Sequence, residues 1–198
     1  LRPTGGKIFF KGLDITWMPI HARARLGMAR CFQITNVFPK LSVLENVRLA
    51  VQAKAGVNFH PFTPVSRFKG LEERSWQVLQ EVGLVEKAGS LAVTLTHGEK
   101  RKLELAMVLA MEPEVLLLDE PTAGISLEEL PVMLELLGQL KEKRDRTILL
   151  VEHKMDMVLS LSDEILVLYN GCFLTRGSPQ EIMNDRRVQE AYLGGGMA

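Results

Sequence analysis

Two adjacent carboxylates, Asp119 and Glu120, directly follow an apolar run at residues 115–118. Such a run predicts a buried strand, and ligands of open α/β sheets gather at the carboxyl ends of strands. Asp119 is therefore placed to reach Mg²⁺, usually through a water, and Glu120 to polarise a water aimed at a γ-phosphate. Taken alone, the motif fits a solvated acidic turn equally well.

A second segment that could bind a substrate runs from Leu95 to Glu99 and immediately precedes a predicted helix. Thr96 and Glu99 have the spacing of a capping box. Gly98, next to His97, lets the backbone approach an anion at the positive end of that helix. The segment can hold phosphate, although a simple helix cap is the commoner role of such a pentapeptide.

Two further polar residues lie at the ends of predicted strands. His153 follows the strand 147–151, which is expected beside the strand that ends in Asp119. Gln33 ends the predicted strand 28–33, and its neutral amide can touch both a metal ion and an attacking water. Alone, neither residue would indicate a function.

The elements that must position these side chains alternate between helix and strand from residue 96 onward. We predict a helix over 99–111, a strand over 115–118, a helix over 127–143 and a strand over 147–151. Such alternation favours parallel strands joined by crossover helices.

The rest of the chain has clear local signals. Turns at Lys11-Gly12 and Asn170-Gly171 predict two hairpins. Helices are expected over 19–26 and 71–82, and capping boxes predict helix starts at Ser42 and Ser178.

The composition of the chain excludes several classes of protein. The 198 residues are 46% hydrophobic and carry 24 basic and 24 acidic side chains, so no overall charge favours nucleic acid or an anionic membrane surface. No apolar run approaches the roughly 20 residues of a membrane-spanning helix. Cys31 and Cys172 lie far apart, which indicates reduced thiols rather than a disulfide or a metal site.

In this order and spacing, the residues resemble the motif set of ABC ATPases, from about Leu1 to Leu193. The matching segments are the Q-loop glutamine Gln33, the signature motif Leu95–Glu99, the Walker B end Leu118–Glu120, the D-loop Ala123–Ser126 and the switch histidine His153. The resemblance implies an α/β fold with a P-loop-type, mostly parallel sheet core, an ABC-type helical subdomain and an incomplete N-terminal β portion.

The resemblance also implies one ABC ATPase domain over residues 1–198. Residues 1–35 would hold residual β structure and the Q-loop, and residues 36–95 the helical subdomain. Residues 96–198 would form the core with the signature helix, Walker B, D-loop, H-loop and a C-terminal hairpin and helix.

Roles for single residues follow from the same resemblance, with ATP and Mg²⁺ as the implied cofactors. Glu120 and His153 would be catalytic, and Asp119 and Gln33 would serve the metal. The residues expected at the nucleotide are Gln33, Thr96, His97, Gly98, Glu99, Asp119 and Ser126.

The partners implied are a second ATPase subunit, transmembrane permease subunits and, indirectly, a solute-binding protein, with no nucleic acid. The location implied is the cytoplasmic face of the inner membrane. Within the family the chain resembles importers of branched-chain amino acids, amides or urea, through segments such as 38–47 and 152–158. An ATPase of a lipid or polysaccharide exporter and an inactive fragment are the alternatives.

The chain departs from the family pattern at the phosphate loop. Gly6-Lys7 does not complete a Walker A motif, because Leu1 occupies the position of the first glycine and Ile8 that of the hydroxyl residue. We expect the chain to start after that loop, and residues 1–198 alone to bind nucleotide weakly and to be poorly soluble.

The signature and the D-loop depart as well. Thr96 and His97 replace the usual Ser and first Gly, and Ser126 replaces the common Asp of the D-loop. Glu99 replaces the usual Gln and brings negative charge toward a polyanion, which would weaken binding unless Lys100, Arg101 or Lys102 compensates it.

Overall fold

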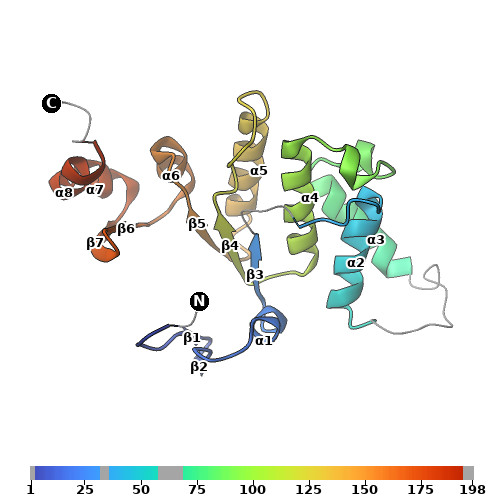
Figure 1. Cartoon of the computed structure of the whole chain (residues 1–198), viewed down its shortest axis with the longest axis horizontal. Helices are drawn as coiled ribbons and strands as arrows, with labels where there is room; N and C mark the ends of the chain where they lie inside the picture. The colour runs from blue at the N-terminus through green and yellow to red at the C-terminus, as the bar shows by residue number, and fades with distance from the viewer. Residues whose placement is uncertain (1–2, 32–35, 58–68, 194–198) are drawn as a thin grey trace.

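A computed structural model describes residues 3–31, 36–57 and 69–193. Its centre is a parallel three-stranded sheet in the order β3-β4-β5 (Figure 1). The strands are β3 (Met28–Cys31), β4 (Val115–Asp119) and β5 (Thr147–Val151). Cys31 pairs with Leu118, and Asp119 pairs with Val151, so β4 and β5 end together. The predicted α/β class with parallel strands is confirmed.

Two helices flank β4 in the sequence and pack against each other: α4 (His97–Ala110) and α5 (Leu130–Glu142). Helix α5 begins three residues later than the predicted start at Leu127, because residues 126–129 form a turn. The buried core includes Leu103 and Leu109 of α4, Leu116 of β4 and Leu140 of α5.

A group of helices lies on the other side of α4 (Figure 1). It contains α2 (Val43–Lys54) and α3 (Lys69–Glu81), both in contact with α4, and the short 3₁₀ turns η2 (Val85–Lys87) and η3 (Ala92–Thr94). Ser42 and Glu45 form the predicted capping box at the start of α2. Because such boxes act over four consecutive residues, sequence alone located this helix start.

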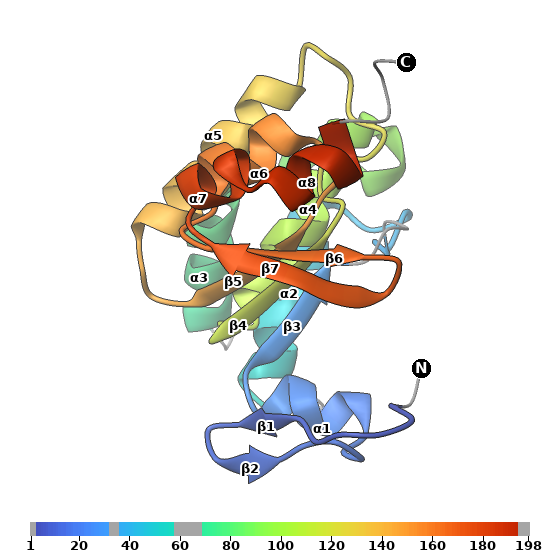
Figure 2. The ribbon, with the colours of Figure 1, turned by 90° about the vertical axis from the view of Figure 1, so that its left-hand side faces the viewer.

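Two antiparallel hairpins flank the sheet (Figure 2). The first pairs β1 (Phe9–Phe10) with β2 (Leu13–Asp14) and precedes α1 (Ile20–Arg25). The second pairs β6 (Ile165–Tyr169) with β7 (Cys172–Gly177). Both turns were predicted, and both turn residues have positive φ in each: Lys11 and Gly12, then Asn170 and Gly171. Such turns match the right-handed twist of the paired strands.

The C-terminal helices complete the fold. Helix α6 (Met155–Leu161) packs against α5, while α7 (Pro179–Asn184) and α8 (Arg186–Val188) contact β7. A π-helical turn, η4 (Gln189–Leu193), follows α8. The described residues contain no helix long and apolar enough to cross a membrane.

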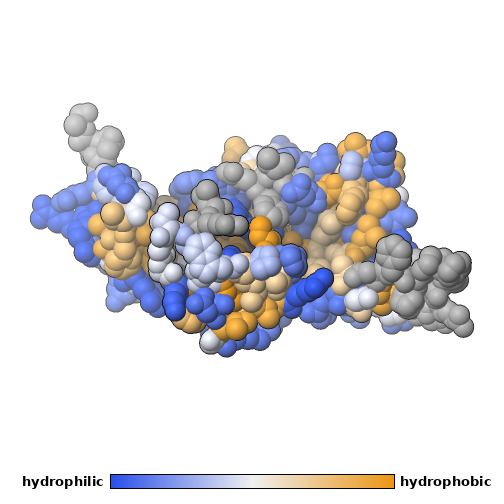
Figure 3. Space-filling view, turned by 60° about the horizontal axis from the view of Figure 1, so that its bottom comes forward, coloured by the Kyte–Doolittle hydropathy of each residue, from blue (hydrophilic) through white to orange (hydrophobic). Residues whose placement is uncertain are grey.

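Apolar side chains remain exposed at several places. Leu149 and Val151, on one face of β5, are 58% and 51% exposed. Phe9, Leu13 and several neighbours are exposed on the N-terminal elements, where Figure 3 shows hydrophobic surface. Exposed apolar surface of this kind favours association with another protein or with a membrane.

Candidate active site

The strongest candidate site lies where β4 and β5 end. Backbone pairing continues past Asp119, since the Glu120 N–H donates to the Val151 carbonyl at 2.9 Å. Glu120 and His153 therefore lie side by side, and His153 Nε2 is 2.9 Å from Glu120 Oε1. An ionised carboxylate only accepts hydrogen bonds, so Nε2 carries the proton in this contact. The structure thus brings together the two residues that the sequence singled out as catalytic.

Glu120 has an unusual backbone. Its φ is +47°, in the left-handed region that side-chain-bearing residues seldom adopt. The conformation is held on both sides, because the Glu120 carbonyl also accepts the Ala123 N–H at 3.0 Å. Local strain that surrounding contacts maintain is characteristic of functional positions. Here it turns a carboxylate that is 23% exposed toward the imidazole of His153.

Asp119 is already paired with a cation. Arg30, on the neighbouring strand β3, donates from Nη2 to Asp119 Oδ2 at 2.6 Å. Mg²⁺ takes one or two protein carboxylates and otherwise keeps waters and phosphates, so Asp119 has suitable oxygen chemistry, but Arg30 competes with a metal for Oδ2. The oxygen chemistry of Asp119 therefore fits the implied metal.

Glu152 ties the two strand ends together. Its Oε1 accepts the Thr122 hydroxyl at 2.6 Å and the Thr122 N–H at 3.2 Å. Its Oε2 accepts the backbone N–H of His153 at 3.1 Å. Glu152 thus links the segment after Glu120 to the one that carries His153. Sequence analysis assigned no role to Thr122 or Glu152, because their pairing spans 30 residues of chain.

We predict that Thr122→Val destabilises the protein by about 1–3 kcal/mol, because a nearly fully buried hydroxyl is lost and the Glu152 carboxylate loses a donor. Thr122→Ser keeps the hydroxyl and serves as the matched control. Urea denaturation followed by circular dichroism measures both. Equal stability of the valine and serine variants would show that the hydrogen bond from the Thr122 hydroxyl to Glu152 contributes nothing to stability.

The predicted capping box at the start of α4 is confirmed. Thr96 Oγ1 accepts the Glu99 N–H at 3.1 Å, and Glu99 Oε2 accepts the Thr96 N–H at 2.9 Å. This backbone hydrogen bond, assisted by Lys87, holds the pKa of Glu99 below its usual value. The described ion pair of Glu99 is with Lys87, whose Nζ lies 3.2 Å from Glu99 Oε1, and not with one of the three basic residues that follow Glu99.

A residue that sequence analysis missed lies directly over this capping box. Thr96 Oγ1 donates to Glu129 Oε1 at 2.7 Å, and Ser126 Oγ donates to Glu129 Oε2 at 3.3 Å. A methyl group on Gly98 would stand 2.7 Å from the Glu129 carboxylate. Three residues assigned to the nucleotide, Thr96, Gly98 and Ser126, therefore converge on one carboxylate. No local signal reveals this contact, which spans 33 residues between Thr96 and Glu129.

His97 lies against Gly124, in the segment that joins Glu120 to the start of α4. A methyl group on Gly124 would lie 2.8 Å from His97 Nε2, and Gly124 has a φ of +73°. Both features require glycine at this position. The D-loop segment 123–126 thus extends from Glu120 at one end to the start of α4 at the other. Gln33, the remaining predicted site residue, lies outside the described residues.

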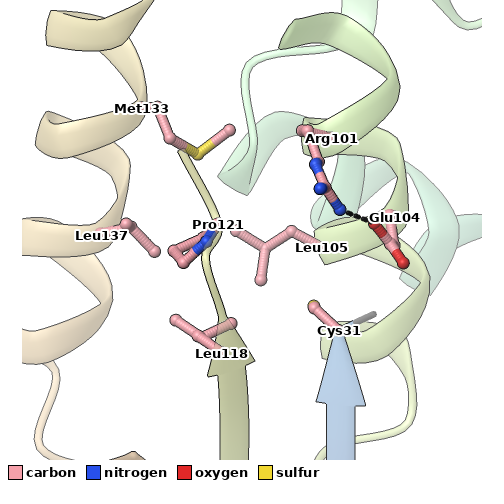
Figure 4. Close-up of a pocket in the computed structure, with 8 residues that line it drawn as sticks. All are labelled: Cys31, Arg101, Glu104, Leu105, Leu118, Pro121, Met133 and Leu137. Atoms are coloured by element: carbon pink, nitrogen blue, oxygen red, sulfur yellow. Dashed lines mark hydrogen bonds and ion pairs between the residues drawn. The ribbon is translucent and has the colours of Figure 1, made fainter. Parts of the chain in front are cut away.

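Helix α4 carries a buried ion pair (Figure 4). Arg101 Nη1 is 3.0 Å from Glu104 Oε2, and both side chains are almost fully buried. They line a cavity of about 10 Å³ with Cys31, whose pKa is raised to about 12 by burial and by the charge of Glu104. Arg101 therefore points into the core rather than toward the charge of Glu99.

A comparison of the sequence with models of known protein families identifies the family of this chain. A family model described as ABC transporter matches residues 1–123, more than half of the chain. The chain belongs to the ABC transporter ATP-binding family. A second model, described as branched-chain amino acid ATP-binding cassette transporter, matches residues 174–198. The strand-end carboxylates and the capped helix are thus parts of an ABC ATPase.

Several relatives and solved structures cover nearly all of this ABC ATPase. The high-affinity branched-chain amino acid transport ATP-binding proteins LivG of Escherichia coli and BraF of Pseudomonas aeruginosa are each 36% identical to it, covering 98% of this chain and 78% of each relative. The lipopolysaccharide export system ATP-binding protein LptB of Acidithiobacillus ferridurans is also 36% identical, over 98% of this chain and 76% of LptB.

Among solved structures, cbiO1 from Clostridium perfringens, described as part of the ABC transporter complex cbiONQ, has a TM-score of 0.77 at 26% identity, over 98% of this chain and 75% of cbiO1. The ADP conformation of the ATP-binding cassette MJ1267 has a TM-score of 0.79 at 23% identity, over 98% of this chain and 79% of that one. The second likeness concerns the fold alone.

Proposed function

We propose that this ABC ATPase drives a membrane importer of branched-chain amino acids. The observation that carries the proposed chemistry is the contact between Glu120 and His153 at the joined ends of β4 and β5. The solute is supported by the likeness to LivG and BraF and by the match of residues 174–198 to the branched-chain amino acid transporter model.

Glu120 acts as the general base in the proposed reaction. It takes a proton from a water whose oxygen bonds to the γ-phosphorus, while the bond from that phosphorus to the bridging oxygen of ADP breaks. His153 donates its ring N–H to Glu120 and orients the carboxylate, and the same N–H would turn to a γ-phosphate oxygen when nucleotide is bound. Asp119 would hold Mg²⁺, which supplies neutralisation of phosphate charge when it is bound.

In this proposal, the start of α4 serves a different nucleotide from the one whose hydrolysis Glu120 assists. Thr96 and Gly98 present a hydroxyl and a helix N-terminus, which suit an anion. We propose that two subunits associate head to tail, so that Thr96, His97, Gly98, Glu99 and Ser126 of one complete the site built on Asp119 and Glu120 of the other. The dimer would lie at the cytoplasmic face of the membrane and transmit its closure to transmembrane permease subunits. A solute-binding protein would deliver the solute.

Deleting the gene in its host and measuring uptake of labelled leucine at low concentration tests this proposal. We expect uptake to fall, to be restored by the full-length gene product and to stay low with Glu120→Gln. Uptake of glucose serves as the control and should not change. Unchanged leucine uptake together with loss of lipopolysaccharide from the cell surface would instead favour an exporter, the alternative suggested by LptB.

A further inference from the structure

Glu129 occupies the place at which an anion is expected to bind. Its Oε1 accepts the Thr96 hydroxyl at 2.7 Å, and its carboxylate lies so close to Gly98 that a methyl group there would stand 2.7 Å from Cδ. The hydroxyl and the helix start that would receive a phosphate therefore already receive a carboxylate from the same chain.

Helix polarity favours this arrangement. Helix α4 has 14 residues, and the unpaired N–H groups of its first turn carry partial positive charge. The Glu99 carboxylate is turned back onto the Thr96 N–H and onto Lys87, so it does not occupy the position over Gly98. Glu129 supplies the negative charge at that position.

We propose that Glu129 is an internal competitor for the signature half-site: its carboxylate holds the start of α4 while the half-site is empty and leaves when the terminal phosphate of a partner-bound nucleotide arrives. The inference rests on the proposed head-to-tail association. Two negative groups cannot share the Thr96 hydroxyl and the backbone of Gly98, because charge repulsion and contact distance both oppose it.

The structure provides room for the displaced side chain. A cavity of about 130 Å³ lies between the starts of α4 and α5, and Glu129, Gly98 and Val132 line it. Lys102 lines the same cavity and offers a positive charge, while Glu99 and Glu128 bring two further carboxylates to its wall. The Glu129 backbone is anchored by its N–H on the Ser126 carbonyl at 3.2 Å, so rotation of the side chain alone can clear the half-site. Because the Glu129 carboxylate competes with the nucleotide phosphate for the start of α4, two subunits need a higher ATP concentration to associate.

Sedimentation of the full-length gene product at increasing ATP tests this, with Glu120→Gln present in every sample to prevent turnover. Adding Glu129→Gln keeps the shape and a hydrogen-bond acceptor but removes the charge. We expect the ATP concentration for half-maximal dimerisation to fall about two- to fivefold, the usual size of a charge effect at a helix start. Glu142→Gln, which neutralises an exposed carboxylate at the far end of α5, is the control and should leave it unchanged.

Glu129→Asp provides a second variant that withdraws the charge by one methylene and should shift dimerisation in the same direction. Circular dichroism checks that both variants fold. Dimerisation at an unchanged or higher ATP concentration in both variants would overturn the role of Glu129 and leave the proposed function standing. Absence of ATP-dependent dimers in every sample, including the Glu129 parent, would overturn the proposed function and this inference with it.

Discussion

Replacing Glu120 with Gln in the full-length gene product is expected to lower kcat for ATP hydrolysis by about 10²- to 10⁴-fold, the contribution usual for a general base. Gln keeps the size of the side chain and accepts a hydrogen bond from His153 Nε2, which lies 2.9 Å from Glu120 Oε1. It cannot take a proton from water. The loss should therefore fall on kcat, while ATP binding persists.

Steady-state hydrolysis and equilibrium ATP binding measure the two quantities separately. Glu142→Gln is a matched control, since Glu142 is an exposed carboxylate near the end of α5. It should leave both quantities unchanged. A Glu120→Gln variant that retains hydrolysis within about threefold of wild type would be inconsistent with base catalysis by Glu120.

The largest effect on stability is expected at the buried pair of Arg101 and Glu104. Their side chains are only 5% and 6% exposed and lie 3.0 Å apart. Arg101→Met or Glu104→Leu alone leaves a buried charge without its partner and should cost about 3–5 kcal/mol of unfolding free energy. The double variant removes both charges and should cost far less than the sum, because apolar residues of similar volume fit a core site.

Urea denaturation of the four proteins gives the coupling free energy between the two residues. Lys100→Met, one position away and only partly buried, should change stability by no more than about 0.5 kcal/mol. Additive losses in the double variant, or single losses below about 1 kcal/mol, would contradict a stabilising pair.

Local chemistry explains what the sequence predicted well. The capping boxes at Ser42, Thr96 and Ser178 act within four residues, and all three are present. The strand 147–151 has the predicted bounds, since an apolar run between polar ends defines it. Glu120 and His153 lie together, because parallel pairing aligns the ends of β4 and β5.

What the sequence could not show depends on contacts between distant segments. Arg30 pairs with Asp119 across 89 positions, and Glu129 reaches Thr96 across 33. Both contacts follow from how helices and strands pack, which no short spacing encodes. The segment boundaries at 35/36 and 95/96 and the role of Gln33 remain predictions.

In the proposed dimer, the start of α4 in one subunit completes the catalytic site of the other. Mixing two inactive full-length proteins tests it directly: one carries Glu120→Gln, and the other carries Gly98→Asp, which places a charged side chain where the half-site must receive phosphate. A mixed dimer contains one site with both Glu120 and Gly98 intact. If sites form between subunits, random mixing should restore about a quarter of wild-type hydrolysis. If each site forms within one chain, the mixture will hydrolyse no more ATP than the two proteins do separately.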